Sequence, residues 1–302
     1  MEMNMIGSKI AEARKQLNLS QAELAQRLFI SPQAVGKWER GESIPDLITF
    51  NRLAKILGVD LNYFSEDFES ASHVIQPEIS ITSRSSEANE LVNFSGSNLP
   101  DTDFAGIIAH KRKFKGSALG GSDFSKADLT GSLFVASDLR GANFNGANLT
   151  DCTFSALDLT DGSFNKTILT RTEFSKSSLE RVKFTDAKLI GAKLTKADLR
   201  TTIFENCVFE GVDFKYSDLS GVCFDRQIFK GVKFHNTALT GASFKGATLQ
   251  NVSFRAQYAL TNKYYRQLKT IHFDGAIMDK LTYAALKGVG VDLSGAIISE
   301  LN

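Results

Sequence analysis

The chain of 302 residues is long enough for one large domain or for two to three ordinary ones, and its composition, 42% hydrophobic and 23% charged, is typical of a globular protein. Thirty-five basic residues against 34 acidic ones give a net charge of +1, which points to no particular class of partner. The chain has 23 phenylalanines beside a single tryptophan, and this excess needs a structural explanation.

The sequence shows no sign of membrane insertion, disulfides or metal. No stretch of 18 apolar residues occurs, and the first residues do not resemble a signal segment, so we expect a cytoplasmic protein without a membrane partner. The three cysteines are an odd number without CxxC spacing, and the four histidines are scattered. We therefore expect no metal, no cofactor and no disulfide framework.

Residues 1–65 follow a helical pattern. Apolar residues recur at helical spacing over residues 6–17, 21–28, 32–40 and 46–57. Ser20 is an N-cap with Glu23 at the capping-box position, and Ser31 is an N-cap followed by Pro32 at the first helical position. Two short helices joined by a tight turn inside a small bundle are typical of a helix-turn-helix.

The string SQAELAQRLFISPQAVGKWERGESIPDLITFNRLAKILGV resembles the DNA-binding domain of the Cro/C1-type (XRE-family) repressors. This resemblance implies that residues 1–65 bind double-stranded DNA and that the second helix of the motif enters the major groove. It places Gln33 and Lys37 against base edges, where Gln suits adenine and Lys suits guanine. It places Gln21, Ser31 and Arg40 against phosphates.

The same resemblance implies a structural ion pair between Arg14 and Glu39, which join the first and third helices. Trp38 shares the inward face of its helix with Val35, so we expect it in the core. An alternative is that the polar residues are simply the solvated face of a small bundle, since residues 1–57 carry eight basic and six acidic residues. That small excess predicts modest non-specific DNA affinity and reliance on a homodimer.

Residues 66–90 contain six serines and no sustained period, which predicts a flexible linker. A random coil of about 25 residues spans roughly 30 Å. We therefore expect the two flanking domains to reorient freely unless the linker docks.

Residues 91–254 repeat every five residues. From Phe94 to Phe254 each of 33 positions is Phe or Leu, except Ala109, and 18 of the 23 phenylalanines fall in this register. The residue two before each of these centres is mostly small. Alternate residues of an extended chain share a face, so the large and the small residue point inward together and the remaining three form a corner.

Blocks such as GANFNGANLT and KADLTGSLF resemble the pentapeptide-repeat proteins, whose pattern is A(D/N)LXX. The resemblance implies an all-β right-handed quadrilateral β-helix with four pentapeptides per coil. Thirty-three repeats make about eight coils, and strands stacked at roughly 4.8 Å give a rod about 40 Å long. Because Phe and Leu mostly alternate, we expect Phe columns on two opposite faces and Leu columns on the other two.

One stretch does not fit the pattern. Arg112 stands at an inward position directly after the missing centre Ala109, and an inward guanidinium needs a partner. We expect a bulge or loop over residues 107–113 that turns Arg112 to solvent. Residues 111–115 then form either a basic patch for a DNA backbone or another anion, or simply a solvated irregular coil.

The period stops after Phe254, and residues 255–302 are expected to form a C-terminal cap. A helix is predicted over residues 256–269 and a short one over residues 282–287. Residues 273–278 and 291–298 resemble residual pentapeptides. The tyrosines of this segment either cover the end of the rod or form a dimer contact, and we favour the cover.

These features predict a sequence-specific transcriptional regulator of bacterial type that binds a short palindromic operator as a homodimer. The rod would be an interaction or sensing module with a protein partner. An alternative is the DNA mimicry by which some pentapeptide-repeat proteins act on type II topoisomerases, but mimicry needs an acidic rod. Residues 90–255 carry 21 basic and 18 acidic residues. No catalytic arrangement is visible, and we expect the protein not to be an enzyme.

Overall fold

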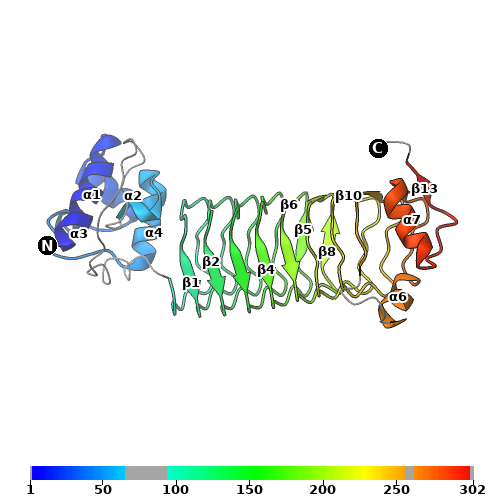
Figure 1. The fold of residues 1–302 in the computed structure, drawn as a ribbon. Coiled ribbons are helices and arrows are strands. Elements are labelled where there is room, and N and C mark those ends of the chain that lie inside the picture. Colours follow the sequence, from blue (N-terminus) through cyan, green and yellow to red (C-terminus); the bar gives the residue numbers. More distant parts are fainter. Residues whose placement is uncertain (1, 65–93, 256–261, 300–302) are drawn as a thin grey trace, which may run out of the picture.

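The computed structural model describes residues 2–64, 94–255 and 262–299 (Figure 1). A helical head lies at one end of a long β-helical rod, and two further helices lie at the other end. The linker predicted over residues 66–90 falls outside the described residues. The two predicted architectures, a small helix-turn-helix bundle and a parallel β-solenoid, are both confirmed.

The head contains four α-helices and one 3-10 helix around an apolar core. Ile10, Leu24, Val35 and Leu53 are fully buried at its centre, and Trp38 is buried as expected. The helices are α1 (Glu2–Gln16), α2 (Gln21–Leu28), α3 (Pro32–Glu39), α4 (Leu47–Leu57) and η1 (Leu61–Phe64).

The rod closes one coil every twenty residues. Phe114 pairs in parallel with Phe134, and Phe134 pairs with Phe154. Single bridges with the same offset continue the stacking on all four sides of the coil. The strands are β1 (Lys113–Lys115), β2 (Leu133–Val135), β3 (Thr153–Ser155), β4 (Glu173–Ser175), β5 (Lys183–Thr185), β6 (Lys188–Ile190), β7 (Lys193–Thr195), β8 (Ile203–Glu205), β9 (Val208–Glu210), β10 (Ile228–Lys230) and β11 (Thr248–Gln250).

The corners of the coil follow from the polar residues of the repeat. The Asp123 carboxylate, one residue before a centre, accepts the backbone N–H of Ser125 at 2.8 Å. The chain then passes through the left-handed region, as at Lys126 (φ 58°) and Gly121 (φ 68°). Asp and Asn favour such local turns and Gly has no Cβ to clash, so the sequence meets the backbone requirement at each corner.

The core of the rod consists of stacked rings. Phe114 and Phe134 stack at 4.5 Å between ring centroids, and Phe124 and Phe144 stack at 5.0 Å. The two columns meet edge to face, with Phe124 and Phe134 at 5.8 Å and 88°. The Phe columns expected on opposite faces are therefore confirmed.

Beyond Phe254 the coil is interrupted and then resumes. The helix α6 (Asn262–Leu268) lies in the interruption, inside the helix expected over residues 256–269. β12 (Ile277–Met278) pairs with β11, and β13 (Ile297–Ile298) pairs with β12, which confirms the residual pentapeptides. α7 (Lys280–Gly288) links the two strands. In Figure 1, α6 and α7 lie at the end of the rod opposite the head.

The head docks directly on the first coil of the rod. The Leu61 N–H donates to the Ile108 carbonyl at 2.8 Å, and the Asn51 amide donates to the Asp103 carbonyl at 2.7 Å. One cluster of buried apolar residues runs from the head into the rod. The expectation that the two domains reorient freely is therefore not met, because α4 and η1 contact the rod themselves.

The bulge expected over residues 107–113 is wrong. The coil is regular there, and Arg112 is only 6% exposed. The Asp60 carboxylate of the head supplies the missing partner, since its charge attracts the Arg112 guanidinium, while burial lowers the pKa of Arg112 below its usual value. Asp60 also lies 2.8 Å from Nδ1 of His110. Residues 107–113, which depart from the repeat in sequence but not in structure, lie where the head contacts the rod.

Candidate DNA-binding surface

The start of α2 is built by a capping box. Ser20 Oγ accepts the Glu23 N–H at 3.1 Å, and the Glu23 carboxylate accepts the Ser20 N–H at 2.7 Å. Two of the four free N–H groups at the helix start are satisfied in this way. Hydrogen bonds from Ser20 lower the pKa of Glu23. The capping box predicted from the sequence is confirmed, and it fixes where α2 begins.

The helix α3 presents one polar and one apolar face. Ser31 caps it, with Oγ accepting the Ala34 N–H at 3.3 Å. Val35 and Trp38 face the core of the head. Gln33 and Lys37 are exposed, and because they lie four residues apart they share the outer face. The structure thus brings together an amide and an ammonium on the outer face of α3, with Gln33 in its first turn and Lys37 in its last.

Arg14, Glu39 and Gln21 form one hydrogen-bonded network behind this helix. Arg14 Nε and Nη2 donate to the two Glu39 oxygens at 2.6 and 2.9 Å, and Arg14 Nη1 donates to the Leu19 carbonyl at 2.6 Å. The Gln21 amide donates to Glu39 at 2.8 Å. The side-chain amide of Gln21, placed by resemblance at a phosphate, is therefore used inside the head.

The network sets the charge states of its members. The hydrogen bond with Glu39 raises the pKa of Arg14 above its usual value. Burial pushes the pKa of Glu39 upward, but hydrogen bonds from Arg14 and Gln21 and the Arg14 charge outweigh it, so the pKa lies below the usual value. The ion pair fastens α1 to α3 and so holds α3 in its orientation.

Arg40 follows α3 and is exposed. Its guanidinium donates to the Glu42 carboxylate at 2.6 and 3.2 Å. An exposed pair of this kind is weak and screened by salt, so the arginine can exchange this carboxylate for another anion. Arg40 and Ser31 flank the Gln33–Lys37 face at the two ends of α3.

Phe29 is a residue of this surface that the sequence pattern did not single out. It lies in the turn between α2 and α3, is 92% exposed, and has a left-handed backbone with φ 56°. A bulky residue seldom adopts this conformation. The signal in the sequence was the aromatic residue itself, at a turn position where Gly or Asn is usual.

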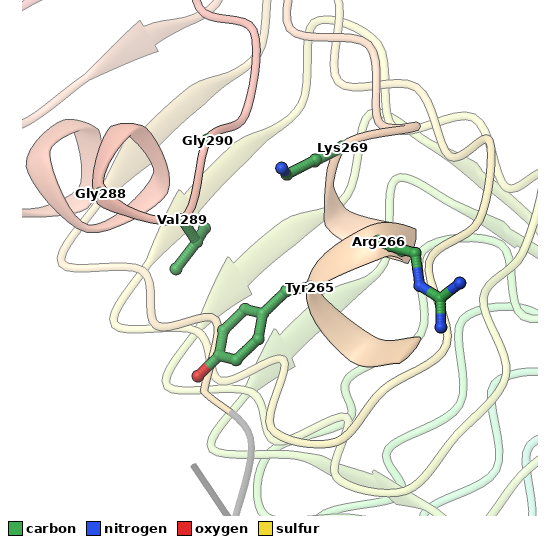
Figure 2. A pocket seen from close by; sticks show the side chains of 6 residues that line it. All are labelled: Tyr265, Arg266, Lys269, Gly288, Val289 and Gly290. Carbon is green, nitrogen blue, oxygen red and sulfur yellow. The ribbon is translucent and has the colours of Figure 1, made fainter. Parts of the chain in front are cut away.

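A hollow elsewhere in the described part of the chain lies near the C-terminal helices. It has a volume of about 820 Å³ and is lined by Tyr265, Arg266, Lys269 and residues 288–290. Figure 2 shows that Lys269 points toward Gly290, whereas Arg266 points away from the hollow. The two cations diverge and do not converge on one anion.

Two further features concern the side chains and helices of residues 2–64, 94–255 and 262–299. These residues contain no group of three or more His, Cys, Asp or Glu side chains that could hold a metal ion. Among the same residues, no helix combines the length and the apolar character needed to cross a membrane.

Comparison with known proteins separates the chain into the same two parts. A helix-turn-helix family model matches residues 10–64. A pentapeptide repeat region matches residues 157–226, and pentapeptide repeats match residues 113–146 and 228–255.

Two curated relatives of the chain are helix-turn-helix transcriptional regulators. The HTH-type transcriptional regulator DicA of Escherichia coli (strain K12) is 29% identical over 111 residues, which are 36% of this chain and 82% of DicA. An uncharacterized HTH-type transcriptional regulator of Methanothermobacter thermautotrophicus is 43% identical over 49 residues, 16% of this chain and 71% of that protein.

Among solved structures, the rod is similar to HetL, a pentapeptide repeat protein involved in heterocyst differentiation regulation from the cyanobacterium Nostoc sp. strain PCC 7120. The two are 25% identical with a TM-score of 0.46, over 70% of this chain and 92% of HetL. By its head, the chain belongs to the family of helix-turn-helix transcriptional regulators, and it joins that head to a pentapeptide-repeat rod.

Proposed function

We propose that the protein is a sequence-specific DNA-binding transcriptional regulator in which α3 enters the major groove. The observation that carries the proposal is the outer face of α3, where Gln33 and Lys37 stand exposed above the buried Val35 and Trp38. An amide makes paired hydrogen bonds to adenine, and an ammonium donates to the O6 and N7 acceptors of guanine. Gln33 and Lys37 therefore read base edges.

Phosphate contacts position the head on the duplex. Ser31 lies at the N-terminus of α3, where free N–H groups and the helix dipole favour an anion. Arg40 is held only by an exposed carboxylate and reaches a phosphate by exchanging it. Gln21 contributes to DNA binding indirectly, because its side-chain amide already donates to Glu39. It places the start of α2 near a phosphate and holds the Glu39 carboxylate in position.

The rod is an interaction module in this proposal, and the regulator acts as a homodimer. Because the head is seated on the first coil by hydrogen bonds and by a shared apolar cluster, any partner of the rod is coupled mechanically to the orientation of α3. A small head with a modest basic excess also needs a second head for tight and selective binding.

Mimicry of DNA by the rod has little support. The rod carries a net excess of basic residues, and carboxylates on its surface pair with arginines. Asp151 lies 2.6 Å from Arg171, and Asp161 lies 2.8 Å from Arg181. A surface of paired charges does not reproduce the continuous negative field of a phosphate backbone.

A gel-shift experiment tests the proposal, with the full chain and a duplex from the region upstream of its own coding sequence. Each good base contact contributes about 1–3 kcal/mol, so replacing both Gln33 and Lys37 by Ala is expected to weaken binding about thirtyfold or more. The matched control replaces Lys15 and Gln16, the same residue types exposed at the end of α1, and is expected to bind as the wild type does. Equal affinity of the Gln33/Lys37 variant and the wild type would contradict the proposal.

A further inference from the structure

One face of the rod carries a ladder of exposed aliphatic side chains. The face is formed by β6, β9, β10, β11, β12 and β13, which pair in parallel without interruption. The first residue of each strand points outward. We call this column the ladder, and it contains Ile168 (38% exposed), Lys188, Val208 (47%), Ile228 (51%), Thr248, Ile277 (38%) and Ile297 (56%).

Charged residues stand beside the centre of the ladder. Glu210 and Lys230 are the third residues of β9 and β10, are both exposed, and are neighbours in register. The centre of the face is slightly hollow, with a volume of about 400 Å³ lined by residues of these two strands and the turns before them. The face thus combines aliphatic side chains with Glu210 and Lys230 at its centre and with two further bases, Lys188 in the ladder and Arg226 at the hollow, and it has room for side chains to enter.

The direction of the two-fold axis decides which residues of this face would meet in a dimer of two copies. When two copies meet face to face, the two-fold axis lies in the plane between them. If the axis runs across the rods between β9 and β10, Val208 meets the partner's Ile228 and Glu210 meets the partner's Lys230. If it runs along the rods, Glu210 meets the partner's Val208 instead, and charges are buried against aliphatic groups without partners, which is costly.

The antiparallel arrangement also pairs the outer members of the ladder on the two copies. Counting outward from an axis between β9 and β10, Ile168 lies opposite the partner's Ile277, and Lys188 lies opposite the partner's Thr248. Eight levels of the coil overlap on each copy, from that of Asn148 to that of Ile297; six of them are strands of this sheet, and the levels of Asn148 and Ile168 are joined to it by single bridges. Val208 thus meets the partner's Ile228 and Ile168 meets the partner's Ile277, whereas Ile297 at the end meets the partner's Asn148. The two central charges, Glu210 and Lys230, meet their opposites.

The area is sufficient for a weak dimer. Eight levels at about 4.8 Å give an overlap about 38 Å long, and a width of about four extended residues is roughly 13 Å. The two faces together bury about 1,000 Å², which is the lower limit for a specific interface. A dimer of this size dissociates on dilution.

We propose that the ladder face is the homodimer interface and that a second copy of this chain docks on it with the rods antiparallel. The inference deepens the proposed role of the rod as an interaction module and rests on that role, while DNA binding by the head does not enter the argument. The occupant is a second copy because the face is complementary to itself in both shape and charge.

The arrangement has a consequence for the spacing of DNA sites. The head is seated at the level of Ile108, five and a half coils from the axis, so the two seats lie about 53 Å apart and the heads lie beyond them. Half-sites one helical turn apart are separated by about 34–36 Å. The dimer therefore serves half-sites at least two turns apart, rather than the short operator expected from the sequence.

Sedimentation equilibrium of the full chain without DNA tests the interface. The wild type is expected to show a concentration-dependent monomer–dimer equilibrium. Glu210→Lys places two lysines opposite each other and is expected to raise the dissociation constant at least about tenfold, as is Lys230→Glu. The double exchange E210K/K230E restores opposite charges and is expected to restore the dimer. The matched control E173K changes a similar acid–base pair, Glu173 and Lys193, on another face and leaves the dimer unchanged.

Cross-linking tests the direction of the rods. Cysteines at positions 168 and 277 lie about 24 Å apart within one chain but opposite each other between antiparallel copies. With the exposed Cys223 replaced by Ser, a short bis-maleimide is expected to join two chains of the double variant I168C/I277C, and neither single variant. A monomer at all concentrations, a dimer insensitive to E210K, or an E210K/K230E variant that stays monomeric would overturn the proposal. A failed gel shift beside an intact charge-dependent dimer would overturn only DNA binding.

Discussion

At the scale of single residues, the small inward side chains of the rod donate hydrogen bonds to backbone carbonyls of the preceding coil. Ser137 Oγ donates to the Phe114 carbonyl at 2.6 Å, and Thr172 Oγ1 donates to the Leu149 carbonyl at 2.7 Å, in each case 23 residues earlier. Cys152 takes the same place, with Sγ 2.9 Å from the Leu129 carbonyl. The cysteines of the inner wall therefore replace serine and threonine.

Thiol reactivity follows from this position. Burial raises the pKa of Cys152 to about 12 and that of Cys207 to about 11, whereas Cys223 is exposed. The thiolate is the reactive form, so at pH 8 a thiol reagent is expected to label one cysteine per native chain rapidly and all three after unfolding. Rapid labelling of two or three thiols in the native chain would contradict the burial of Cys152 and Cys207.

The Arg14–Glu39 pair predicts a pH dependence of the head. The pKa of Glu39 is depressed in the folded chain, so the pair stabilises the head above the unfolded value of about 4.3, and this stabilisation is lost as the pH falls through the depressed pKa. Replacing Glu39 by Gln leaves Arg14 without its counter-charge at a site about one tenth exposed, and is expected to cost about 3 kcal/mol at neutral pH.

Trp38 is the only tryptophan of the chain and lies in the head, so its fluorescence during urea unfolding measures this effect. The variant E39Q is also expected to show a flatter stability profile below about pH 5. The exposed Glu42 provides the control, and E42Q should leave the transition in place. Equal midpoints for E39Q and E42Q would argue against a stabilising pair.

At the scale of elements, the rod is a stack in which each ring depends on its neighbours. Phe144 stacks at 5.0 Å on Phe124 and on Phe164, and meets Phe134 and Phe154 edge to face. Removing one ring leaves a cavity that the neighbouring coils cannot fill without breaking strand pairing.

Replacing Phe144 by Ala is therefore expected to lower the free energy of unfolding of the rod by about 3–5 kcal/mol, and replacing it by Leu by less than about 1.5 kcal/mol. Urea unfolding followed by far-ultraviolet circular dichroism provides the measurement. A loss below about 1 kcal/mol for the Ala variant would show that the stack does not hold the rod together.

The repeating elements could be predicted from the sequence because each residue contacts the residue at the same position of the next coil, 20 positions away. A period of five decides which side chains point inward, and the Phe columns and the resumed coils near Met278 follow from it. The side-chain partner of Gln21 could not be predicted this way, since Glu39 lies 18 positions later on another helix. Arg40 pairs with Glu42 only two residues away, in a stretch that has no repeat to predict where side chains point. Arg112 was placed wrongly because its partner, Asp60, is 52 positions away in the other domain.

At the scale of the whole molecule, the contacts between head and rod decide whether the two domains move together or independently. Asp60 faces both His110 and the buried Arg112, and Leu61 pairs with the first coil. A buried arginine that loses its counter-charge is strongly destabilising where it lies. The charge of Asp60 is thus one polar tie between head and rod, beside the hydrogen bonds of Leu61 and Asn51.

Replacing Asp60 by Asn is expected to loosen the head. Time-resolved fluorescence anisotropy of Trp38 measures this, because the wild-type head rotates with the rod while a loosened head adds a faster component. Lys55 and Asp103 also link the two parts, but their exposed pair at 3.5 Å contributes little, so K55A provides the control. A fast component already present in the wild type would contradict a fixed seat.

Recovery of DNA from a random-sequence library by the full-length protein tests the central claim most directly. If α3 reads bases, the wild type will enrich a defined sequence, the Lys15/Gln16 control will enrich the same one, and the variant with Ala at Gln33 and Lys37 will lose it. Failure of the wild type to enrich any sequence, or enrichment of the same sequence by the Gln33/Lys37 variant, would contradict the account.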